Sequence, residues 1–310
     1  MPQTNSTPEY DVAIVGGGPA GLSAAIVLGR SRRRVVLFDD GHPRNYAAQG
    51  VHCYLGHEGI APDALRELGR KEAQDYGVQF VDAKVLAARR LSQPDKSLAG
   101  FELQTSNRTL VVRALLLCTG VVDVLPEIPN LREFYGRSVH HCPYCDGWEH
   151  RDKRLVAFGK KATGAVELAV SLRSWSPHVT ACSHGGRLDD ELRSQLARKE
   201  IEFRQERIVE LHGNDGVLRE LTFESGPPLE CDALFFSSDQ FQRSPLGAQL
   251  GIESDDDNCM KTGKKQTTRI PGLFLAGDAD GEVQFAIVAA AEGAVAAVTI
   301  NHLLQEDDRC

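Results

Sequence analysis

A glycine-rich turn near the start of the chain constrains its fold more than any other feature. Residues 16–21 read GGGPAG and follow the short apolar run 11–15, which predicts a strand. Small residues over 20–29 predict a helix that packs closely, and the apolar run 35–38 predicts a second strand. A strand, a glycine turn, a helix and a strand in this order predict a Rossmann-type dinucleotide-binding unit.

Each part of this turn has a physical role in holding a dinucleotide. Gly16 allows the tight turn, Gly18 lets the backbone approach the pyrophosphate, and Gly21 permits close packing of the helix on the strand. The helix N-terminus offers free N–H groups and partial positive charge to the phosphates. Asp39 ends the second strand, where a carboxylate can bond a ribose hydroxyl. We therefore expect a dinucleotide at this turn.

A second unit of the same kind is predicted further along the chain. Residues 155–159 are expected to form a strand, 163–172 a helix of small residues, and 179–182 the next strand. The apolar runs 114–120 and 273–276 predict two more strands, each ending in a glycine turn, and a long Ala-rich helix is expected from Gln284 to about Leu304. The pattern indicates an α/β fold with two Rossmann-like units.

Length and composition narrow the class of protein. The chain has 310 residues, enough for two domains, with 42% hydrophobic and 25% charged residues, as in soluble globular proteins. The net charge of −8 argues against nucleic-acid binding. No apolar run approaches the ~18 residues of a membrane span, and the first ten residues lack the apolar core of a secretory signal. We expect a cytoplasmic protein that binds no membrane.

A CxxC pair, Cys142 and Cys145, lies within the sequence CPYCDG at 142–147. Such a pair alone is ambiguous, since it can be a redox disulfide, half of a zinc site or two unrelated thiols. His140 and His141 are near, but zinc would need a second ligand pair and no second CxxC exists. With eight cysteines in a reducing compartment, a close pair is more often functional than structural. Beside a dinucleotide site, it favours electron transfer between a cofactor and sulfur.

The motifs together resemble the low-molecular-weight thioredoxin reductases and their relatives among the FAD-dependent pyridine-nucleotide–disulfide oxidoreductases. The resemblance covers nearly the whole chain, and the motifs come in the family's order. They are GGGPAG with Asp39, LLLCTG at 115–120 (with Cys118 in place of the family's alanine), CPYCDG at 142–147, LFLAGD at 273–278 and QFA at 284–286.

The resemblance implies FAD as cofactor, a homodimer, and two Rossmann-like domains of the three-layer ββα kind. By analogy the FAD domain is discontinuous, over 1–121 and 241–310, and the inserted pyridine-nucleotide-binding-like domain spans 122–240 and carries the CxxC. The residues that the resemblance assigns to FAD are Gly16, Gly18, Pro19, Ala20, Gly21, Asp39, Asn45, Gly120, Gly277, Asp278, Gln284, Phe285 and Ala286.

The resemblance also assigns roles at the CxxC. Cys145 would face the flavin and exchange electrons with it, and Cys142 would attack the sulfur of the substrate. Thiolate attack then proceeds through a mixed disulfide. Asp146 would act as the general acid and base that handles the thiol proton. The roles of His140, His141 and the last residue, Cys310, stay open, and Cys118, Cys182 and Cys231 are expected to be core thiols.

The second dinucleotide turn departs from the family pattern. Residues 159–165 read GKKATGA, with Lys161 where the second glycine is expected. After the next strand, Gly185 and Gly186 stand where the family has two arginines that hold the 2′-phosphate of NADPH. The segments 39–45, 55–59 and 172–176 resemble a subset that includes dithiol oxidases and reductases fed by ferredoxin. These departures disfavour NAD(P)H as a cofactor, although Asp146 matches the reductases.

The preferred interpretation is an FAD-dependent thiol–disulfide oxidoreductase that works without NADPH. Its partner at the CxxC would be a thioredoxin-like protein or a small dithiol or disulfide. The flavin would in turn receive electrons from a ferredoxin-type donor or pass them to oxygen as acceptor. The alternatives are an NAD(P)H-dependent thioredoxin reductase, a flavin NAD(P)H reductase of a non-sulfur acceptor, and a flavin-binding partner protein without activity. The electron donor and the direction of flow stay open.

Overall fold

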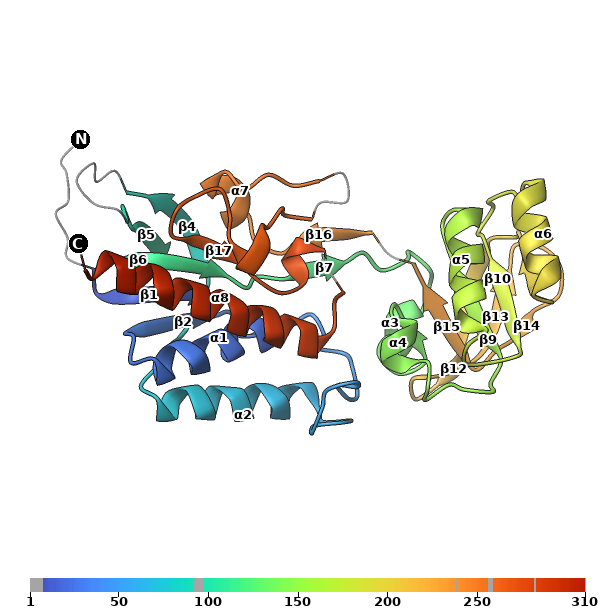
Figure 1. Cartoon of the computed structure of the whole chain (residues 1–310). Coiled ribbons are helices and arrows are strands. Elements are labelled where there is room, and N and C mark those ends of the chain that lie inside the picture. The colour runs from blue at the N-terminus through green and yellow to red at the C-terminus, as the bar shows by residue number, and fades with distance from the viewer. Residues whose placement is uncertain (1–7, 92–97, 238, 256–258, 282, 310) are drawn as a thin grey trace. The chain divides into compact units, whose positions relative to one another are not determined.

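A computed structural model of the chain describes residues 8–91, 98–237, 239–255, 259–281 and 283–309. The chain forms two compact units (Figure 1). The first comprises Met1–Tyr46, Cys53–Val122 and Gln240–Cys310, and the second comprises Ala47–His52 and Asp123–Asp239. The sequence analysis placed the domain boundaries between residues 121 and 122 and between residues 240 and 241. In the structure the boundaries of the two units lie between 122 and 123 and between 239 and 240, and residues 47–52 are grouped with the second unit.

The first unit is built on a seven-stranded sheet with the strand order β3-β2-β1-β6-β5-β4, in which β17 also pairs with β6. The long strand β6 has room for both neighbours because β5 pairs with its first half and β17 with its second. Strands β3, β2, β1, β6 and β17 run parallel, and β4 and β5 form an antiparallel hairpin. The bounds are β1 (Tyr10–Val15), β2 (Val35–Asp39), β3 (Gln79–Asp82), β4 (Val85–Arg90), β5 (Phe101–Thr105), β6 (Thr109–Leu117) and β17 (Leu273–Leu275).

Helices cover one face of the parallel strands of this sheet (Figure 1), and its strands β4 and β5 share a core with the other face of the parallel strands. Successive side chains of a strand point to opposite faces. Accordingly, Val12 and Ile14 of β1 lie in the core beneath α1 and α8, whereas Ala13 and Val15 lie in the core shared with β4, β5 and α7. This is the predicted three-layer arrangement. The helices are α1 (Pro19–Arg30), α2 (Pro62–Asp75), α7 (Leu246–Leu250) and α8 (Ala286–Asp307), with short 3-10 helices η1 (Lys264–Gln266) and η2 (Asp278–Asp280).

Helix α8 packs against α1 through small residues. A Cβ added to Gly293 would lie 2.0 Å from the carbonyl oxygen of Ala20, so only glycine allows this approach. By length and composition α8 could also cross a membrane, so the expectation that no stretch is long and apolar enough was wrong. Its residues Ala296, Ala297 and Ile300 belong to the core of the first unit, and core helices meet the same criteria.

The second unit repeats the layered plan around a five-stranded parallel sheet with the order β11-β10-β9-β15-β8. Helices α5 and α6 share the core on one face, and the antiparallel sheet β12-β13-β14 shares the core on the other. The short strands β7 and β16 pair with each other where the chain passes between the units. The bounds are β7 (Val121–Asp123), α3 (Leu131–Phe134), β8 (Val139–His140), α4 (Pro143–Asp146), β9 (Leu155–Phe158), α5 (Ala162–Leu172), β10 (Val179–Cys182), α6 (Asp190–Arg198), β11 (Glu202–Arg204), β12 (Ile208–Asn214), β13 (Val217–Phe223), β14 (Leu229–Glu230), β15 (Ala233–Phe236) and β16 (Gln240–Gln242).

Candidate active site

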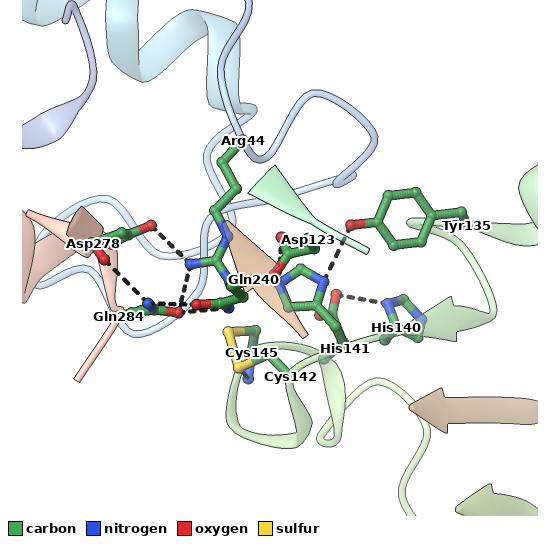
Figure 2. Close-up of a disulfide and its surroundings, with 11 residues drawn as sticks. Arg44, Asp123, Tyr135, His140, His141, Cys142, Cys145, Gln240, Asp278 and Gln284 are labelled. Atoms are coloured by element: carbon green, nitrogen blue, oxygen red, sulfur yellow. Dashed lines mark hydrogen bonds and ion pairs between the residues drawn. A yellow bond between two sulfur atoms is a disulfide. The ribbon is translucent and has the colours of Figure 1, made fainter. Parts of the chain in front are cut away.

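The two cysteines of the CxxC are joined as a disulfide in the second unit (Figure 2). Their Cα atoms are 5.3 Å apart, within the usual range for a disulfide. Cys142 is the N-cap of α4, Pro143 is its first residue, and the Sγ atom of Cys142 accepts a hydrogen bond from the amide of Cys145 at 3.2 Å. A cysteine at a helix start is placed where N–H groups stabilise a thiolate.

Asp146 ends α4 and lies beside two buried histidines. The Nδ1 atom of His140 is 3.2 Å from the Asp146 carboxylate, and the Nε2 atoms of His140 and His150 are 2.9 Å apart. Both rings are buried and pack against Phe235. Burial lowers the pKa of His150 to about 4, and the positive charges of His140 and Lys153 add to the effect, so His150 is neutral at pH 7.

His141, the neighbour of His140, has a different set of contacts. Its Nδ1 atom is 3.2 Å from the hydroxyl of Tyr135, as Figure 2 shows, and its Nε2 atom is 3.8 Å from the carboxylate of Asp123. The Asp123 side chain is almost fully buried. The two adjacent histidines thus lie beside different carboxylates, His140 beside Asp146 and His141 beside Asp123.

Two exposed aromatic side chains lie in and just after α4. Tyr144, between the two cysteines, is exposed and meets the ring of Trp175 edge to face, with 5.3 Å between ring centroids. Trp148 is also exposed, and the guanidinium of Arg151 lies 4.3 Å above its ring. Tyr144 thus has a protein partner within the second unit.

In the first unit, the glycine-rich turn has the geometry that the sequence predicted. Gly16 has a φ of +115°, and a Cβ there would lie 2.1 Å from the carbonyl oxygen of Cys118. A Cβ on Gly21 would lie 1.9 Å from the carbonyl oxygen of Gly16. A Cβ on Gly18, in contrast, would meet no described atom within 4 Å. Gly16 and Gly21 are thus required by the fold, whereas Gly18 leaves space at the start of α1, just before Pro19 and Ala20.

Asp39 lies beside this turn and is held by a residue that the sequence analysis did not identify. Its Oδ2 atom accepts a hydrogen bond from Arg66 of α2 at 2.7 Å, and its Oδ1 atom accepts one from the amide of Gly41 at 3.1 Å. The carboxylate also lies against Gly17, where a Cβ would be 2.3 Å from Oδ2. Arg66 therefore fixes the acid expected to bond the ribose.

A polar cluster of four residues in the first unit joins three segments that are far apart in the sequence (Figure 2). Arg44 donates to Asp278 and to Gln284, both at 2.8 Å, and Gln284 exchanges two hydrogen bonds with Gln240 at 2.9 and 3.0 Å. Asp278 and Gln284 were predicted site residues; Arg44 and Gln240 were not. Arg44 lies in the segment 39–45 that the sequence analysis noted, but no local signal gives Arg44 or Gln240 this role, because the role is recognisable only from the partners in the fold.

The other predicted FAD residues lie around the same turn and cluster. Asn45 is half-buried next to Arg44, Phe285 is the N-cap of α8, and Ala286 is the first residue of that helix. The helix expected from Gln284 thus begins two residues later. Gly120 has a φ of +63°, and Gly277 donates its N–H to the carboxylate of Glu292 at 2.6 Å.

Observations on the first unit fit a flavin dinucleotide. The Thr119 hydroxyl, which follows β6, is buried without a hydrogen-bond partner among the described residues, although buried hydroxyls are normally paired. The α1 N-terminus is open at Gly18 and suits a pyrophosphate. Asp39 and Asp278 offer carboxylates for ribose or ribityl hydroxyls. FAD, when bound, supplies the capacity to accept and release two electrons.

The corresponding turn of the second unit is arranged differently. Lys161 is the N-cap of α5 with an extended backbone and an exposed side chain. The ammonium of Lys160 is 3.8 Å from Asp239. After β10, the hydroxyl of Ser183 donates to the carbonyl of Gly186 at 2.6 Å and closes a turn. A Cβ on Gly186 would lie 2.9 Å from the amide nitrogen of Ala162, the first residue of α5.

The sequence pattern of the pyridine nucleotide-disulphide oxidoreductase family matches residues 10–293, nearly the whole chain. The chain belongs to this family. It is similar to thioredoxin reductase tcpT of Claviceps purpurea, with 31% identity over 86% of both chains. Among solved structures, it resembles the putative thioredoxin reductase TrxB of Bacillus anthracis, with 30% identity, a TM-score of 0.89, and 96% of this chain and 99% of the other covered. It also resembles HlmI, with 32% identity, a TM-score of 0.92, and 98% and 96% covered.

The chain is therefore a thioredoxin reductase-like flavoprotein, an FAD-dependent disulfide oxidoreductase. These findings confirm the predicted family, fold class, enzyme class and flavin cofactor. The electron donor, the partner, and the individual roles of the site residues stay predictions.

The remaining thiols of this oxidoreductase differ from the CxxC. Cys118, Cys182 and Cys231 are buried, as predicted, and burial raises the pKa of each, to about 12 for Cys182. They stay protonated and unreactive at neutral pH. Cys53 is exposed, and Cys310 lies outside the described residues. Within the described ranges, no three His, Cys, Asp or Glu side chains form a group that could hold a metal ion.

Proposed function

We propose that this flavoprotein is a thiol–disulfide oxidoreductase that exchanges electrons between FAD and a dithiol or disulfide partner through Cys142 and Cys145, without using NADPH. Cys142 attacks the partner sulfur, Cys145 exchanges electrons with the flavin, and Asp146 handles the thiol proton. The enzyme works as a cytoplasmic homodimer, a part of the proposal that comes from the family resemblance and from cysteine usage.

The contact between Gly186 and the start of α5 carries this proposal. A Rossmann unit binds a pyrophosphate on the free N–H groups at the start of its first helix, so the space in front of these groups must be open. At Gly18, the N-cap of α1, this space is open, because a Cβ there would meet no described atom within 4 Å. In the second unit, the Gly186 turn lies against the equivalent helix start, at the amide of Ala162.

The residues after β10 also argue against a nicotinamide dinucleotide. The register of the strands pairs Phe38 with Val15 and Cys182 with Phe158, so Ser183 is the counterpart of Asp39. A serine whose hydroxyl is bonded to Gly186 replaces the carboxylate that would bond an NAD ribose. Gly185 and Gly186 offer no guanidinium for a 2′-phosphate. At these positions the turn therefore has neither a carboxylate for the ribose hydroxyls of NAD nor a guanidinium for the 2′-phosphate of NADP.

The chemistry of the site favours a partner with two thiols or a disulfide. A CxxC disulfide takes two electrons from a dithiol in two exchange steps. The first step forms a mixed disulfide between the enzyme and the partner, and the second releases the partner as a disulfide and leaves both cysteines reduced. We propose a thioredoxin-like protein or a small dithiol as this partner. Electrons then pass to FAD and on to oxygen, or come from a ferredoxin-type donor in the opposite direction.

An anaerobic titration that follows the visible absorbance of the flavin tests the proposal. NADPH, NADH, a reduced iron–sulfur protein and dithiothreitol are added in separate samples. Bleaching by dithiothreitol or by the iron–sulfur protein, with neither nicotinamide effective, is the expected result. Rapid bleaching by NADPH would overturn the proposal.

The second candidate function is an NAD(P)H-dependent thioredoxin reductase. Two relatives are named thioredoxin reductases, without an electron donor in the name. One observation favours it. The guanidinium of Arg207 lies beside the 185–186 turn, with its Nε atom 3.7 Å from a Cβ built on Gly185. A single arginine there offers one guanidinium to a 2′-phosphate. Under this candidate, Arg207→Ala raises the KM for NADPH about tenfold; under our proposal there is no NADPH-dependent turnover to change.

A further inference from the structure

His141 directly precedes Cys142 in the chain and contacts two groups that the chemistry proposed above does not use. Its Nε2 atom is 3.8 Å from the Asp123 carboxylate, and its Nδ1 atom is 3.2 Å from the Tyr135 hydroxyl. All of these residues belong to the second unit, and Figure 2 draws them in the surroundings of the disulfide. A histidine, a carboxylate and a phenol therefore meet one residue from the sulfur that attacks the partner.

Burial strengthens the contact between His141 and Asp123. The Asp123 side chain is 4% exposed, and the fully buried ring of Phe236 lies 6.2 Å from that of His141. A carboxylate removed from water in this way is normally paired, and an opposite charge within about 4–6 Å favours the protonated imidazole. The His141 side chain is itself 26% exposed, so its ring exchanges protons with solvent, unlike the buried His140 and His150.

The Tyr135 hydroxyl orients the His141 ring without fixing its charge. A hydroxyl both donates and accepts hydrogen bonds. A protonated ring donates from Nδ1 to the Tyr135 oxygen, and a neutral ring with its proton on Nε2 accepts from the Tyr135 O–H. Asp123 is therefore the contact that favours one charge state over the other.

We propose that Asp123 holds His141 as an imidazolium and that this positive charge stabilises the thiolate of Cys142 during thiol–disulfide exchange. The inference rests on the function proposed above, since it takes Cys142 as the exchanging sulfur. The two side chains leave adjacent Cα atoms, about 3.8 Å apart, which keeps the charge within about a Debye length of the sulfur, ~10 Å at 0.1 M salt. A nearby imidazolium is one of the settings that make protein thiols reactive.

The exchange with a partner dithiol shows where this charge acts. A partner thiolate bonds to the Sγ atom of Cys142 while the bond between Cys142 and Cys145 breaks, and Cys145 leaves as a thiolate. The second partner thiolate then attacks the partner sulfur of the mixed disulfide, and Cys142 leaves as a thiolate beside His141. Two electrons pass from the partner to the cysteines, and the two partner protons go to solvent. His141 keeps its proton throughout. In the opposite direction, the same Cys142 thiolate attacks a partner disulfide.

The other charged groups around the CxxC act in different directions. Asp146, when ionised, opposes a thiolate, and its carboxylate lies 3.2 Å from His140. His150 is neutral at pH 7, since its pKa is about 4, and adds no positive charge. Strand β15 presents the uncharged ring of Phe236 to His141. His141 is thus the group that can offset the negative charge of Asp146 from the N-terminal side of Cys142.

Alkylation by iodoacetamide measures the thiolate directly. In a Cys145→Ser background with FAD bound, position 142 is a free thiol. Peptide mass spectrometry follows its modification at each pH, separately from that of the exposed Cys53. We expect His141→Gln and Asp123→Asn each to raise the pH midpoint at position 142 by about one unit. His141→Lys keeps a positive charge and should reverse most of this shift, a result that a purely structural role would not give.

His212→Gln is the matched control. The Nε2 atom of His212, on β12, is 3.8 Å from the Glu210 carboxylate and 3.1 Å from the Thr222 hydroxyl, so it has the same kinds of contact, but its carboxylate is well exposed. We expect this variant to keep the parental midpoint at Cys142, and every variant to keep it at Cys53. Tryptophan fluorescence, which comes from the second unit, checks that each variant is folded.

Three outcomes would count against the inference. A parental midpoint in both His141→Gln and Asp123→Asn would overturn it. Additive shifts in the double variant would also overturn it, because the two residues are proposed to act through one charge. A shift in His141→Gln alone would reject the part assigned to Asp123.

The alkylation experiment is independent of the electron donor. It uses neither NADPH nor a partner dithiol, so it can reject the role of His141 while the flavin titration still supports the proposed function. Conversely, rapid bleaching of the parental flavin by NADPH would overturn the proposed function, and a raised midpoint in His141→Gln would still support the imidazolium beside Cys142.

Discussion

Arg66 of α2 donates a hydrogen bond to Asp39 at 2.7 Å and thereby fixes the carboxylate that ends β2 next to the glycine turn. Both side chains are mostly buried, so the pair is poorly screened by water. With Arg66→Ala, the carboxylate loses its fixed position. We expect FAD affinity to fall about tenfold, or about 1.4 kcal/mol. Titration of flavin-free protein with FAD, followed by flavin fluorescence, measures the change.

Arg70 provides the control for this substitution. It lies one turn further along α2 and pairs with Asp82, which is well exposed, so the pair contributes little. Arg70→Ala is expected to leave FAD affinity unchanged. Equal affinities of the parental protein and the Arg66→Ala variant would show that Asp39 needs no support from α2.

The fold was predictable wherever residues close in sequence determine the structure. The strand–turn–helix of β1 and α1 was predicted to within one residue at each end, because the signal is local: Gly21 meets the carbonyl of Gly16 within the same turn. Strand β10 was predicted at its observed bounds, since four buried residues in a row are typical of a parallel strand. The amphipathic helices α2 and α6 were missed because little of their surface is buried.

The site was predictable only where a motif carries it. Asp278 and Gln284 belong to local motifs, whereas their partner Arg44 lies more than 230 positions away in the sequence. The same holds for His150, which is four residues past Asp146 and has no motif of its own. Its connection to Asp146 runs through His140, whose Nε2 atom lies 2.9 Å from that of His150. Such pairs follow from tertiary packing, which spacing alone does not encode.

Two glycine substitutions separate binding from folding in the first unit. A methyl group on Gly18 meets no described atom, so Gly18→Ala should fold with parental stability but block the approach of the pyrophosphate. We expect FAD affinity to fall about 100-fold. Gly21→Ala places a methyl group 1.9 Å from a carbonyl oxygen and should destabilise the flavin-free protein by about 2 kcal/mol or more.

Urea unfolding of the flavin-free variants, together with FAD titration, distinguishes the two effects. A Gly18→Ala protein as unstable as Gly21→Ala would mean that Gly18 serves the fold and not the cofactor.

His150 predicts a pH dependence of stability in the second unit. Its pKa is about 4 in the folded protein against an ordinary value of 6.5, so the unfolded chain binds a proton more readily between these values. Stability is therefore complete above about pH 6.5 and falls as the pH is lowered toward 4, by up to about 3 kcal/mol. His150→Phe should reduce this loss, because no imidazole is left to charge.

The two tryptophans of the chain, Trp148 and Trp175, both lie in the second unit, so tryptophan fluorescence reports its unfolding. Urea unfolding at pH 7.5 and pH 5 is measured for the parental protein and His150→Phe. His212→Gln serves as the control and should keep the parental pH dependence. The same loss of stability on acidification in all three proteins would assign it to other groups.

The disulfide itself gives the last prediction. Cys142 caps α4, and its Sγ atom accepts the Cys145 amide, so a serine hydroxyl at position 142 can keep this cap. Cys142→Ser should therefore fold and retain FAD, since the flavin residues lie in the first unit, but it should lose disulfide exchange, with activity below about 1% of parental because no nucleophilic sulfur remains.

The matched control is Cys53→Ser, which removes an exposed thiol and should leave the exchange rate unchanged. Reduction of a dithiol reagent or its disulfide is measured beside the flavin absorbance of each variant. Exchange at the parental rate in a flavin-loaded Cys142→Ser protein would remove this cysteine from the mechanism, and a colourless variant would mean that the disulfide segment supports flavin binding.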